Sequence, residues 1–157
     1  MSTTQDYARF RKQLVSLGAD LHGSAKRIVA KMRDTAYTVT VKNTPVGKYS
    51  NIVYFETEQG KPVYFKTHFH KQGGTLKRGW ERGKTLRVGN GWQSEYHNNV
   101  YYAVYVNNGH GRVNRWGETT GYVKGKRMLE QGIDTARRQS GAIMRSEVER
   151  IKRKTGF

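Results

Sequence analysis

The sequence predicts an α+β fold, in which a small antiparallel sheet packs against a long N-terminal helix and a C-terminal helix. Segments at both ends of the chain repeat apolar residues at helical steps of three and four. Between them, short β-branched and aromatic segments alternate with turns rich in glycine and asparagine. Because 157 residues is the usual size of one domain, we take 1–157 as a single domain.

The first predicted helix covers residues 5–33. Lysines and arginines occupy the face opposite its apolar stripe, as they would on a solvated surface. Gly18 and Gly23 each cost about 1 kcal/mol relative to alanine, so we expect a bend or break there. Residues 37–42 alternate and are β-branched, which predicts a short strand before a turn at 43–47. The residues of the apolar stripe are Phe10, Leu14, Leu17, Leu21, Ala25, Ile28 and Met32.

Two hairpins are predicted in the middle of the chain. Segments 51–57 and 61–68 are rich in aromatic and β-branched residues and flank a polar turn that ends in glycine. Segments 84–88 and 92–96 flank Gly-Asn-Gly, which readily supplies the positive φ of a hairpin turn. Together the two hairpins predict one antiparallel sheet.

The remainder of the chain predicts a short element, a loop and a helix. For residues 99–106 the periodicity fits either a buried strand or a short helix, and the family resemblance described below favours the helix. Residues 107–122 hold four glycines and one tryptophan, so we expect a long loop that becomes ordered against a neighbouring subunit. Apolar spacing predicts the final helix over 126–154, and its basic last turn complements the negative end of the helix dipole.

The chain is strongly basic, with 29 Lys and Arg against 12 Asp and Glu and a formal net charge of +17. This charge predicts attraction to nucleic acid, to acidic protein surfaces or to anionic membranes. Only 35% of the residues are hydrophobic, so a partner is expected to complete the core. No segment approaches the ~20 apolar residues of a membrane span, and the N-terminus lacks a signal peptide's apolar core. We therefore expect a soluble protein made in the cytoplasm, without a membrane partner.

Basic and aromatic side chains are interleaved over residues 64–87. A surface that neutralises phosphates and stacks on bases has this composition, and so does a soluble hairpin whose lysines face water. From the first interpretation we predict contact with a polyanion or an acidic partner. The predicted contact residues are Lys66, Lys77, Arg78, Arg82 and Arg87.

The sequence offers little material for a metal site. With no cysteine, the chain has neither disulfides nor cysteine-based zinc sites. His68 and His70 are two residues apart and would project from one face of a strand, as a pair of metal ligands would. No Asp or Glu lies in the segment 61–80 that contains them. We therefore expect neither a metal site nor a cofactor.

Hydrolytic chemistry requires a nucleophile beside a base, or a carboxylate pair that holds a metal, and the sequence has neither pattern. His110 beside Arg112, with Glu118 further along, is the one arrangement able in principle to cleave RNA by acid–base chemistry. A histidine flanked by glycines is more often an interface residue. We therefore predict no catalytic residues.

Three sequence blocks, in a fixed order, resemble a known protein family. They are Gly-Gly-Thr-Leu-Lys-Arg-Gly-Trp at 73–80, Val-Tyr-Tyr-Ala-Val-Tyr-Val-Asn-Asn-Gly-His at 100–110, and Gly-Tyr-Val-Lys-Gly-Lys-Arg-Met-Leu at 121–129. These blocks are similar to those of the tail-completion or head-to-tail joining (neck) proteins of tailed bacteriophages. The Thr-Pro-Val-Gly at 44–47 resembles the segment that precedes the first block in that family.

The resemblance covers roughly residues 44–135 and departs from the family pattern in two places. Residues 49–72 are longer than the expected link between the Thr-Pro-Val segment and the first block, which predicts an inserted hairpin. Asn107 and Asn108 stand where an acidic residue is commoner, so charge is missing at an expected contact.

The resemblance implies a non-enzymatic structural subunit of a ring at the phage neck or tail end, of the tail-completion, tail-terminator or head-to-tail joining type. Such a subunit is part of the virion and assembles in the host cytoplasm. Its implied partners are further copies of the chain in a homo-oligomeric ring and neighbouring tail or connector proteins, and contact with the packaged DNA is left open. The alternative class is a small basic nucleic-acid-binding protein or nuclease.

We expect the subunit interface in and beside the glycine-rich segment 107–122. Tryptophan and arginine are enriched among the residues that dominate interface energies, so Trp116 with Arg112 and Arg115 is the expected docking group. The alternative is that Trp116 packs back onto its own sheet. The predicted interface residues are Tyr102, Tyr105, His110, Arg112, Arg115 and Trp116.

Overall fold

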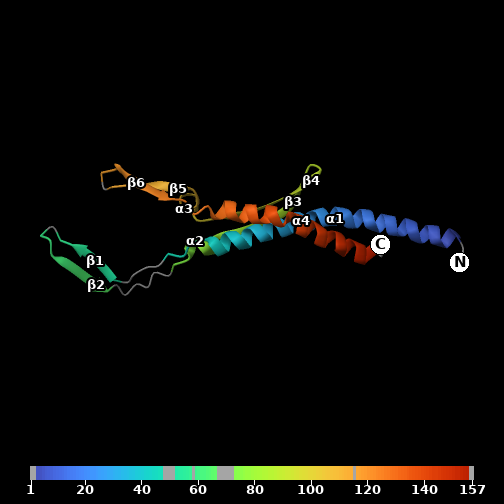
Figure 1. Ribbon diagram of the computed structural model, residues 1–157, viewed down its shortest axis with the longest axis horizontal. Coiled ribbons are helices and arrows are strands. Elements are labelled where there is room, and N and C mark those ends of the chain that lie inside the picture. The colour runs from blue at the N-terminus through green and yellow to red at the C-terminus, as the bar shows by residue number, and fades with distance from the viewer. Residues whose placement is uncertain (1–2, 48–51, 58, 67–72, 115, 156–157) are drawn as a thin grey trace.

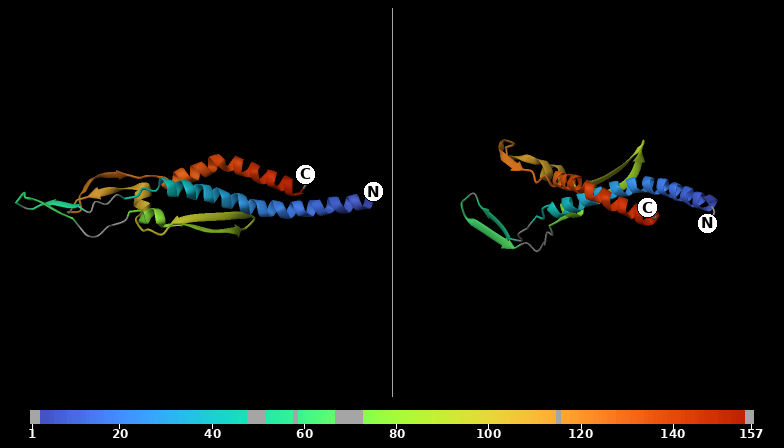
Figure 2. Two further views of the ribbon diagram at one scale, coloured as in Figure 1. Left: turned by 90° about the horizontal axis from the view of Figure 1, so that it is seen from below. Right: turned by 45° about the vertical axis from the view of Figure 1, so that its right-hand side comes forward.

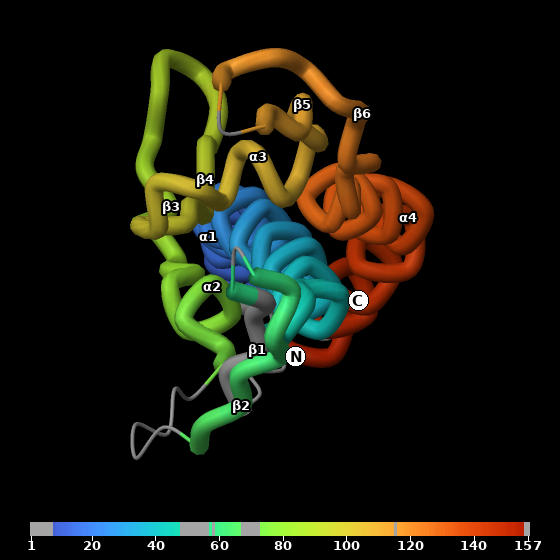
Figure 3. Tube along the Cα trace, turned by 90° about the vertical axis from the view of Figure 1, so that its left-hand side faces the viewer, coloured from blue at the N-terminus to red at the C-terminus, as the bar shows by residue number. Residues whose placement is uncertain are grey.

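The α+β fold is confirmed in a computed structural model, which describes residues 3–47, 52–57, 59–66, 73–114 and 116–155. Two long antiparallel helices, α1 (Thr3–Asn43) and α4 (Met128–Thr155), form an elongated body (Figure 1). The N-terminal part of α1 extends beyond the end of α4 (Figure 2). Seen along the body, α1 lies between α4 and a β-ribbon (Figure 3). No helix in the described residues is long and apolar enough to cross a bilayer.

Helix α1 is continuous, which makes two expectations wrong. Gly18 and Gly23 lie within it and do not break it, and residues 37–42 continue the helix instead of forming a strand. At residues 37–42 the reason is packing, because Ala36 and Thr40 are buried and Tyr37 packs against the hydrophobic core. Burial of this kind outweighs the small helix penalty of β-branched residues.

The predicted hairpins are confirmed, but they do not share a sheet. Strands β1 (Ile52–Glu56) and β2 (Pro62–Lys66) pair antiparallel, as do β3 (Trp80–Val88) and β4 (Gly91–Asn98). The described strands form separate two-stranded sheets, and the single sheet that we expected is absent among them. Ribbon β3–β4 instead lies along α1 and packs its inner face on that helix. Helix α1, rather than a second ribbon, therefore covers the inner face of ribbon β3–β4.

The segment expected as a long loop is largely a third hairpin, so this expectation is wrong. Strand β5 (Gly109–Val113) pairs antiparallel with β6 (Thr119–Lys124). A two-turn helix, α3 (Ala103–Asn108), precedes it and confirms the helical alternative for that region. The glycines suggested a loop, but an asparagine at the hairpin's turn supplies the hydrogen bonds that order it.

The hydrophobic core lies where the end of α1, the short helix α2 (Thr75–Arg78) with β3, and the start of α4 meet. Leu76, Trp80 and Met128 are its buried centre. The Trp80 indole Nε1 donates a 2.8 Å hydrogen bond to Thr44 Oγ1, and Thr44 Oγ1 donates to the Thr40 carbonyl at 2.7 Å. Thr44 therefore ends α1 and joins it to β3.

Gly132 allows α4 to approach α1 closely. A Cβ at this position would collide with Thr40 Oγ1 and stand 2.5 Å from the Ala36 carbonyl oxygen. The Thr40 hydroxyl donates to the Met128 carbonyl at 3.2 Å and lies 3.1 Å from the Tyr96 hydroxyl. This crossing joins both long helices to β4.

Gly47 and Gly73 lie side by side, on either side of the predicted insertion at 49–72. A Cβ on Gly73 would collide with the Gly47 carbonyl oxygen. The chain therefore leaves the body and returns to it at one point, as an inserted hairpin requires. Hairpin β1–β2 extends away from the helical body at the end opposite the two termini (Figure 1).

Candidate functional site

The molecule exposes far more surface than a compact monomer of its mass. Its accessible area is 12427 Å², whereas an 18.0 kDa globular monomer exposes roughly 8,000 Å². Large apolar side chains are exposed on α1, α3, α4 and all three hairpins. Large exposed apolar patches are typical of surfaces that take part in association.

The turn of hairpin β5–β6 presents Trp116 to solvent on an ordered scaffold. Asn114 Oδ1 accepts hydrogen bonds from the backbone N–H groups of Trp116 (3.0 Å) and Glu118 (2.9 Å). Asn114 Nδ2 donates to Glu118 Oε2 at 2.8 Å. Within this turn the Trp116 residue is 79% exposed, so it does not pack back onto its own sheet.

The other predicted interface residues follow the same hairpin and the helix before it. Tyr105 is exposed, and its ring lies edge-on to that of His110, with 6.3 Å between the centroids, at the base of the hairpin. Arg112 lies on β5, between the base and the turn. Tyr102 is half-buried and packs against the core at the start of α3, so it is only partly available to a partner. Arg115 lies outside the described residues.

Asn107 fixes the base of this hairpin to the start of α4. Its side-chain Oδ1 accepts a hydrogen bond from Leu129 N (3.0 Å), and its Nδ2 donates to the Glu130 carboxylate at 3.0 and 3.1 Å. The Asn107 carbonyl also accepts from Arg127 N at 2.9 Å. A buried amide both donates and accepts here, which a carboxylate is unable to do.

The predicted basic contact residues are spread over three elements. Lys66 ends β2, Lys77 and Arg78 lie on α2, and Arg82 and Arg87 lie on β3. Arg78 donates to the Gly73 carbonyl at 3.1 Å, and the Arg87 guanidinium lies 3.5 Å from His22 Nε2. The structure therefore gives part of this charge a role within the subunit.

Arg82 contacts two residues of α1. Its Nε lies 3.5 Å from Asp34 Oδ1, and its guanidinium carbon lies 4.2 Å from the centroid of the Tyr37 ring. A guanidinium over an aromatic face contributes about 0.5–1 kcal/mol at an exposed site. Arg82 therefore helps to hold β3 on α1.

Exposed basic residues are also spread along the part of the body that carries both termini. Two helices far apart in sequence contribute them, so their common location follows only from the antiparallel packing of these helices. They are Arg9, Arg11, Lys12 and Lys26 from α1, and Arg145, Lys152 and Arg153 from α4.

The buried carboxylate of Glu147 joins helices α1 and α4. Burial alone would raise the pKa of Glu147, but hydrogen bonds from Arg27, Arg150 and Ser24 outweigh it and lower its pKa to about 2. Lys31 Nζ lies 3.6 Å from the second carboxylate oxygen.

A second ion pair joins the helices one step further toward the termini. Lys154 Nζ lies 2.7 Å from Asp20 Oδ1. That hydrogen bond lowers the pKa of Asp20. The helix pair is therefore held by charge at the terminal end and by Gly132 at the other.

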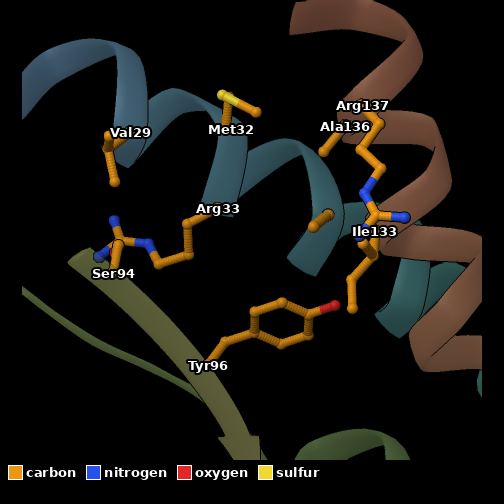
Figure 4. A pocket seen from close by; sticks show the side chains of 9 residues that line it. Val29, Met32, Arg33, Ser94, Tyr96, Ile133, Ala136 and Arg137 are labelled. Carbon is orange, nitrogen blue, oxygen red and sulfur yellow. The ribbon is translucent and has the colours of Figure 1, made fainter. Parts of the chain in front are cut away.

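Two pockets flank the core. One, of about 300 Å³, lies between α1, β4 and α4 and is lined mainly by apolar side chains (Figure 4). The Tyr96 hydroxyl points into it toward Ile133, and Arg33 reaches toward Ser94. Burial raises the pKa of Tyr96. The other, of about 320 Å³, lies beside α3 and is lined by three asparagines as well as by apolar residues.

The structure does not bring the possible acid–base residues together. The His110 ring contacts Tyr105 at the base of the hairpin, whereas the Glu118 carboxylate is hydrogen-bonded to Asn114 at its turn. The described residues contain no group of three His, Asp or Glu side chains that could hold a metal ion. His68 and His70 lie outside the described residues.

Three residues that organise these surfaces were missed by sequence reasoning. Asn114 stands three residues before a glycine, a composition typical of turns, and this signal was available. Glu147 stands three residues before Arg150, which predicts an ion pair but not its burial. Asn107 stands out only as a departure from the family pattern, and its structural role was missed because its partners lie on the next helix.

Comparisons of this chain with protein-family models, with curated proteins and with solved structures found no match.

Proposed function

We propose that the chain is a non-enzymatic structural subunit of a ring at the neck or tail end of a tailed bacteriophage, of the tail-completion, tail-terminator or head-to-tail joining type. One observation carries this proposal. The three blocks that resemble that family are far apart in sequence but meet in one core. Leu76 and Trp80 come from the first block, Ala103 and Val106 from the second, and Met128 from the third. The resemblance therefore falls on the residues that hold the subunit together.

The exposed surface supports assembly. Among the described residues, the buried hydrophobic ones form a small set around the helix crossings. The apolar side chains of hairpin β5–β6 and of the N-terminal half of α1 face solvent instead. Association with further copies would cover these side chains, and each Å² of apolar area removed from water contributes about 25 cal/mol.

The proposed partners are other copies of this chain and the neighbouring tail or connector proteins of the virion, with assembly in the host cytoplasm. Purified wild-type chain should form a discrete oligomer at moderate salt, detected by native mass spectrometry and by analytical ultracentrifugation. It should also co-sediment with phage tails or virions. A chain that stays monomeric at all concentrations and does not sediment with tails would contradict this function.

The alternative function, a small basic nucleic-acid-binding protein or nuclease, is favoured by the net charge of +17 and by the exposed basic residues along α1 and α4. Incubation with RNA and with DNA, with and without divalent metal, separates the two classes. We expect salt-sensitive binding at most, and no turnover. Hydrolysis by a monomeric species that His110→Ala abolishes would replace the structural proposal.

A further inference from the structure

We propose that Trp116 of one copy docks into the apolar pocket between α1, β4 and α4 of a second copy, so that subunits associate head to tail. This inference rests on the proposed function, because it names the contact that joins neighbouring subunits of the ring. The pocket is lined by Val29, Met32, Arg33, Ala36, Ser94, Tyr96, Ile133, Ala136 and Arg137.

Trp116 is prepared for docking. It is the large apolar residue at a turn whose backbone is fixed by the Asn114 side chain. Little conformational entropy is therefore lost when it binds, and preorganisation of this kind increases affinity. Tryptophan is also the residue most enriched among those that dominate binding energies.

The pocket suits one large side chain. Its volume of about 300 Å³ lies at the lower end of the ~300–1,000 Å³ typical of ligand sites. Val29, Met32 and Ile133 provide aliphatic surface for an indole (Figure 4). Ile133 is 36% exposed, and the side chain of Arg137 is largely exposed, so the pocket is accessible from solvent.

Charge complements shape at this contact. Arg137 lines the pocket, and its Nη1 lies 3.8 Å from a carboxylate oxygen of the exposed Asp134. Glu118 lies two residues from Trp116 in the same turn, where its Oε2 accepts a hydrogen bond from Asn114 Nδ2. In the docked state Glu118 is the acidic group of the turn that would face Arg137, and the arginines of the pocket also favour an indole face through cation–π attraction.

The contact joins two different copies. Hairpin β5–β6 extends from the start of α4 in the direction opposite to α4 itself (Figure 1). Five residues of strand carry the turn about 17 Å from its base, away from the pocket. A turn and a pocket at two separate places on the subunit allow each copy to dock into the next, and such a heterologous contact closes into a ring when the rotation permits.

The pocket beside α3 is less suited to binding the Trp116 indole. Asn98, Asn107 and Asn108 line it, and all three side chains make hydrogen bonds within the chain. An indole placed there would cover amides without offering them partners. This pocket therefore supplies a control position, Val104, which lines it and is exposed.

The test compares full-length variants in the assembly assay. Trp116→Ala removes the anchor, and Ile133→Trp fills the receiving pocket. Each should raise the concentration for half-assembly at least about tenfold, as the loss of an anchor worth more than 1.4 kcal/mol predicts. Tyr101→Ala, at a residue 86% exposed on the body, and Val104→Trp should assemble as the wild type does.

Mixing tests whether the turn of one copy docks into the pocket of another. Trp116→Ala retains its pocket and Ile133→Trp retains its turn, so an equal mixture has one productive contact per pair. It should give heterodimers and no rings. Arg137→Glu, a surface change that leaves the pocket's apolar lining intact, should weaken assembly, and the added change Glu118→Lys should restore it.

The outcomes also separate this inference from the proposed function. If Trp116→Ala and Ile133→Trp assemble like the wild type, the docking contact is wrong while the ring proposal stands. A wild-type chain that never assembles would overturn both. Unchanged circular dichroism of both variants is the check that loss of assembly is not loss of folding.

Discussion

Glu147 on α4 and Arg27 on α1 form an ion pair in which the side chain of the carboxylate is only 1% exposed. Arg150 joins the same carboxylate at 2.8 Å, and the two arginines reach it from different helices. Burial would oppose the charge on Glu147, so these hydrogen bonds must exceed the desolvation cost for the carboxylate to stay ionised.

Glu147→Gln should lower the free energy of unfolding by about 2–3 kcal/mol, because it leaves Arg27, Arg150 and Lys31 without a counter-charge. This expected loss of unfolding free energy is smaller than for a fully buried ion pair, because the arginines are partly exposed. Glu149→Gln is the matched control. Glu149 pairs with Lys152 on the surface at 3.2 Å, so its loss should cost less than about 1 kcal/mol. Urea unfolding at neutral pH measures both changes, and equal effects would contradict the buried role.

The contribution of Glu147 should depend on pH in the acid range. Its folded-state pKa of about 2 lies below its ordinary value of 4.5, so the unfolded state binds the proton first. This stability is fully present above pH 4.5 and is lost as the pH falls toward 2. The unfolding free energies of the wild type and of Glu147→Gln should therefore converge between these values. A difference that stays constant down to the lower pH would show that the carboxylate does not titrate there.

Gly132→Ala should destabilise the chain by about 1–3 kcal/mol, because its Cβ meets Thr40 Oγ1 and the Ala36 carbonyl at the helix crossing. Gly141→Ala on the same helix has only Arg145 nearby, at an ordinary 3.7 Å. That substitution should stabilise α4 by up to about 1 kcal/mol through helix propensity. Thermal unfolding should move the two melting temperatures in opposite directions, and a shared direction would contradict the close crossing.

Asn107→Asp should cost about 1–3 kcal/mol, because a second carboxylate then faces Glu130 and the donated hydrogen bonds are lost. Adding Glu130→Gln reverses donor and acceptor and should recover most of the loss. A double-mutant cycle in denaturant measures this coupling. Independent, additive effects of the two changes would show that the pair does not hold α3 to α4. This contact also explains why an acidic residue at Asn107 would not fit this chain.

Arg82→Gln should lower stability by about 1 kcal/mol, through loss of the Asp34 ion pair and of the Tyr37 ring contact. Lys84→Gln, on the exposed side of the same strand, removes the same charge and should leave stability unchanged. Both variants should weaken binding to a heparin column equally if Arg82 is also an outward polyanion contact. If only Lys84→Gln elutes earlier, the charge of Arg82 serves the fold alone.

The sequence predicts the long helices and two of the hairpins because each carries a periodicity of its own. It fails at residues 37–42, where β-branched residues suggest a strand. Their burial against Trp80 and α4 comes from partners more than 40 positions away, so no local pattern reveals it. The joining of ribbons into one sheet fails for the same reason, because strand edges pair only where the fold brings them together, and it leaves the hairpins as separate two-stranded sheets.

For the candidate site, the sequence identifies Trp116 and its arginine neighbours but not how they are presented. The glycines around Trp116 argue for a loop, and one asparagine at position 114 changes that result by capping the turn. The pocket that we propose as its receiver draws on α1, β4 and α4, and no run of sequence contains it. A pocket whose lining comes from three elements can be recognised only in the folded structure.

The adjacency of Gly47 and Gly73 brings together the two ends of the segment between them. Its length can change without moving the helices, because the loop-closure cost rises only slowly with the number of residues. Relatives of this chain could therefore gain, lose or exchange this segment while they retain the same subunit body. For the same reason, a direct link from Gly47 to Gly73, or a fluorescent or affinity tag placed there, offers a way to engineer the protein at the point it tolerates best.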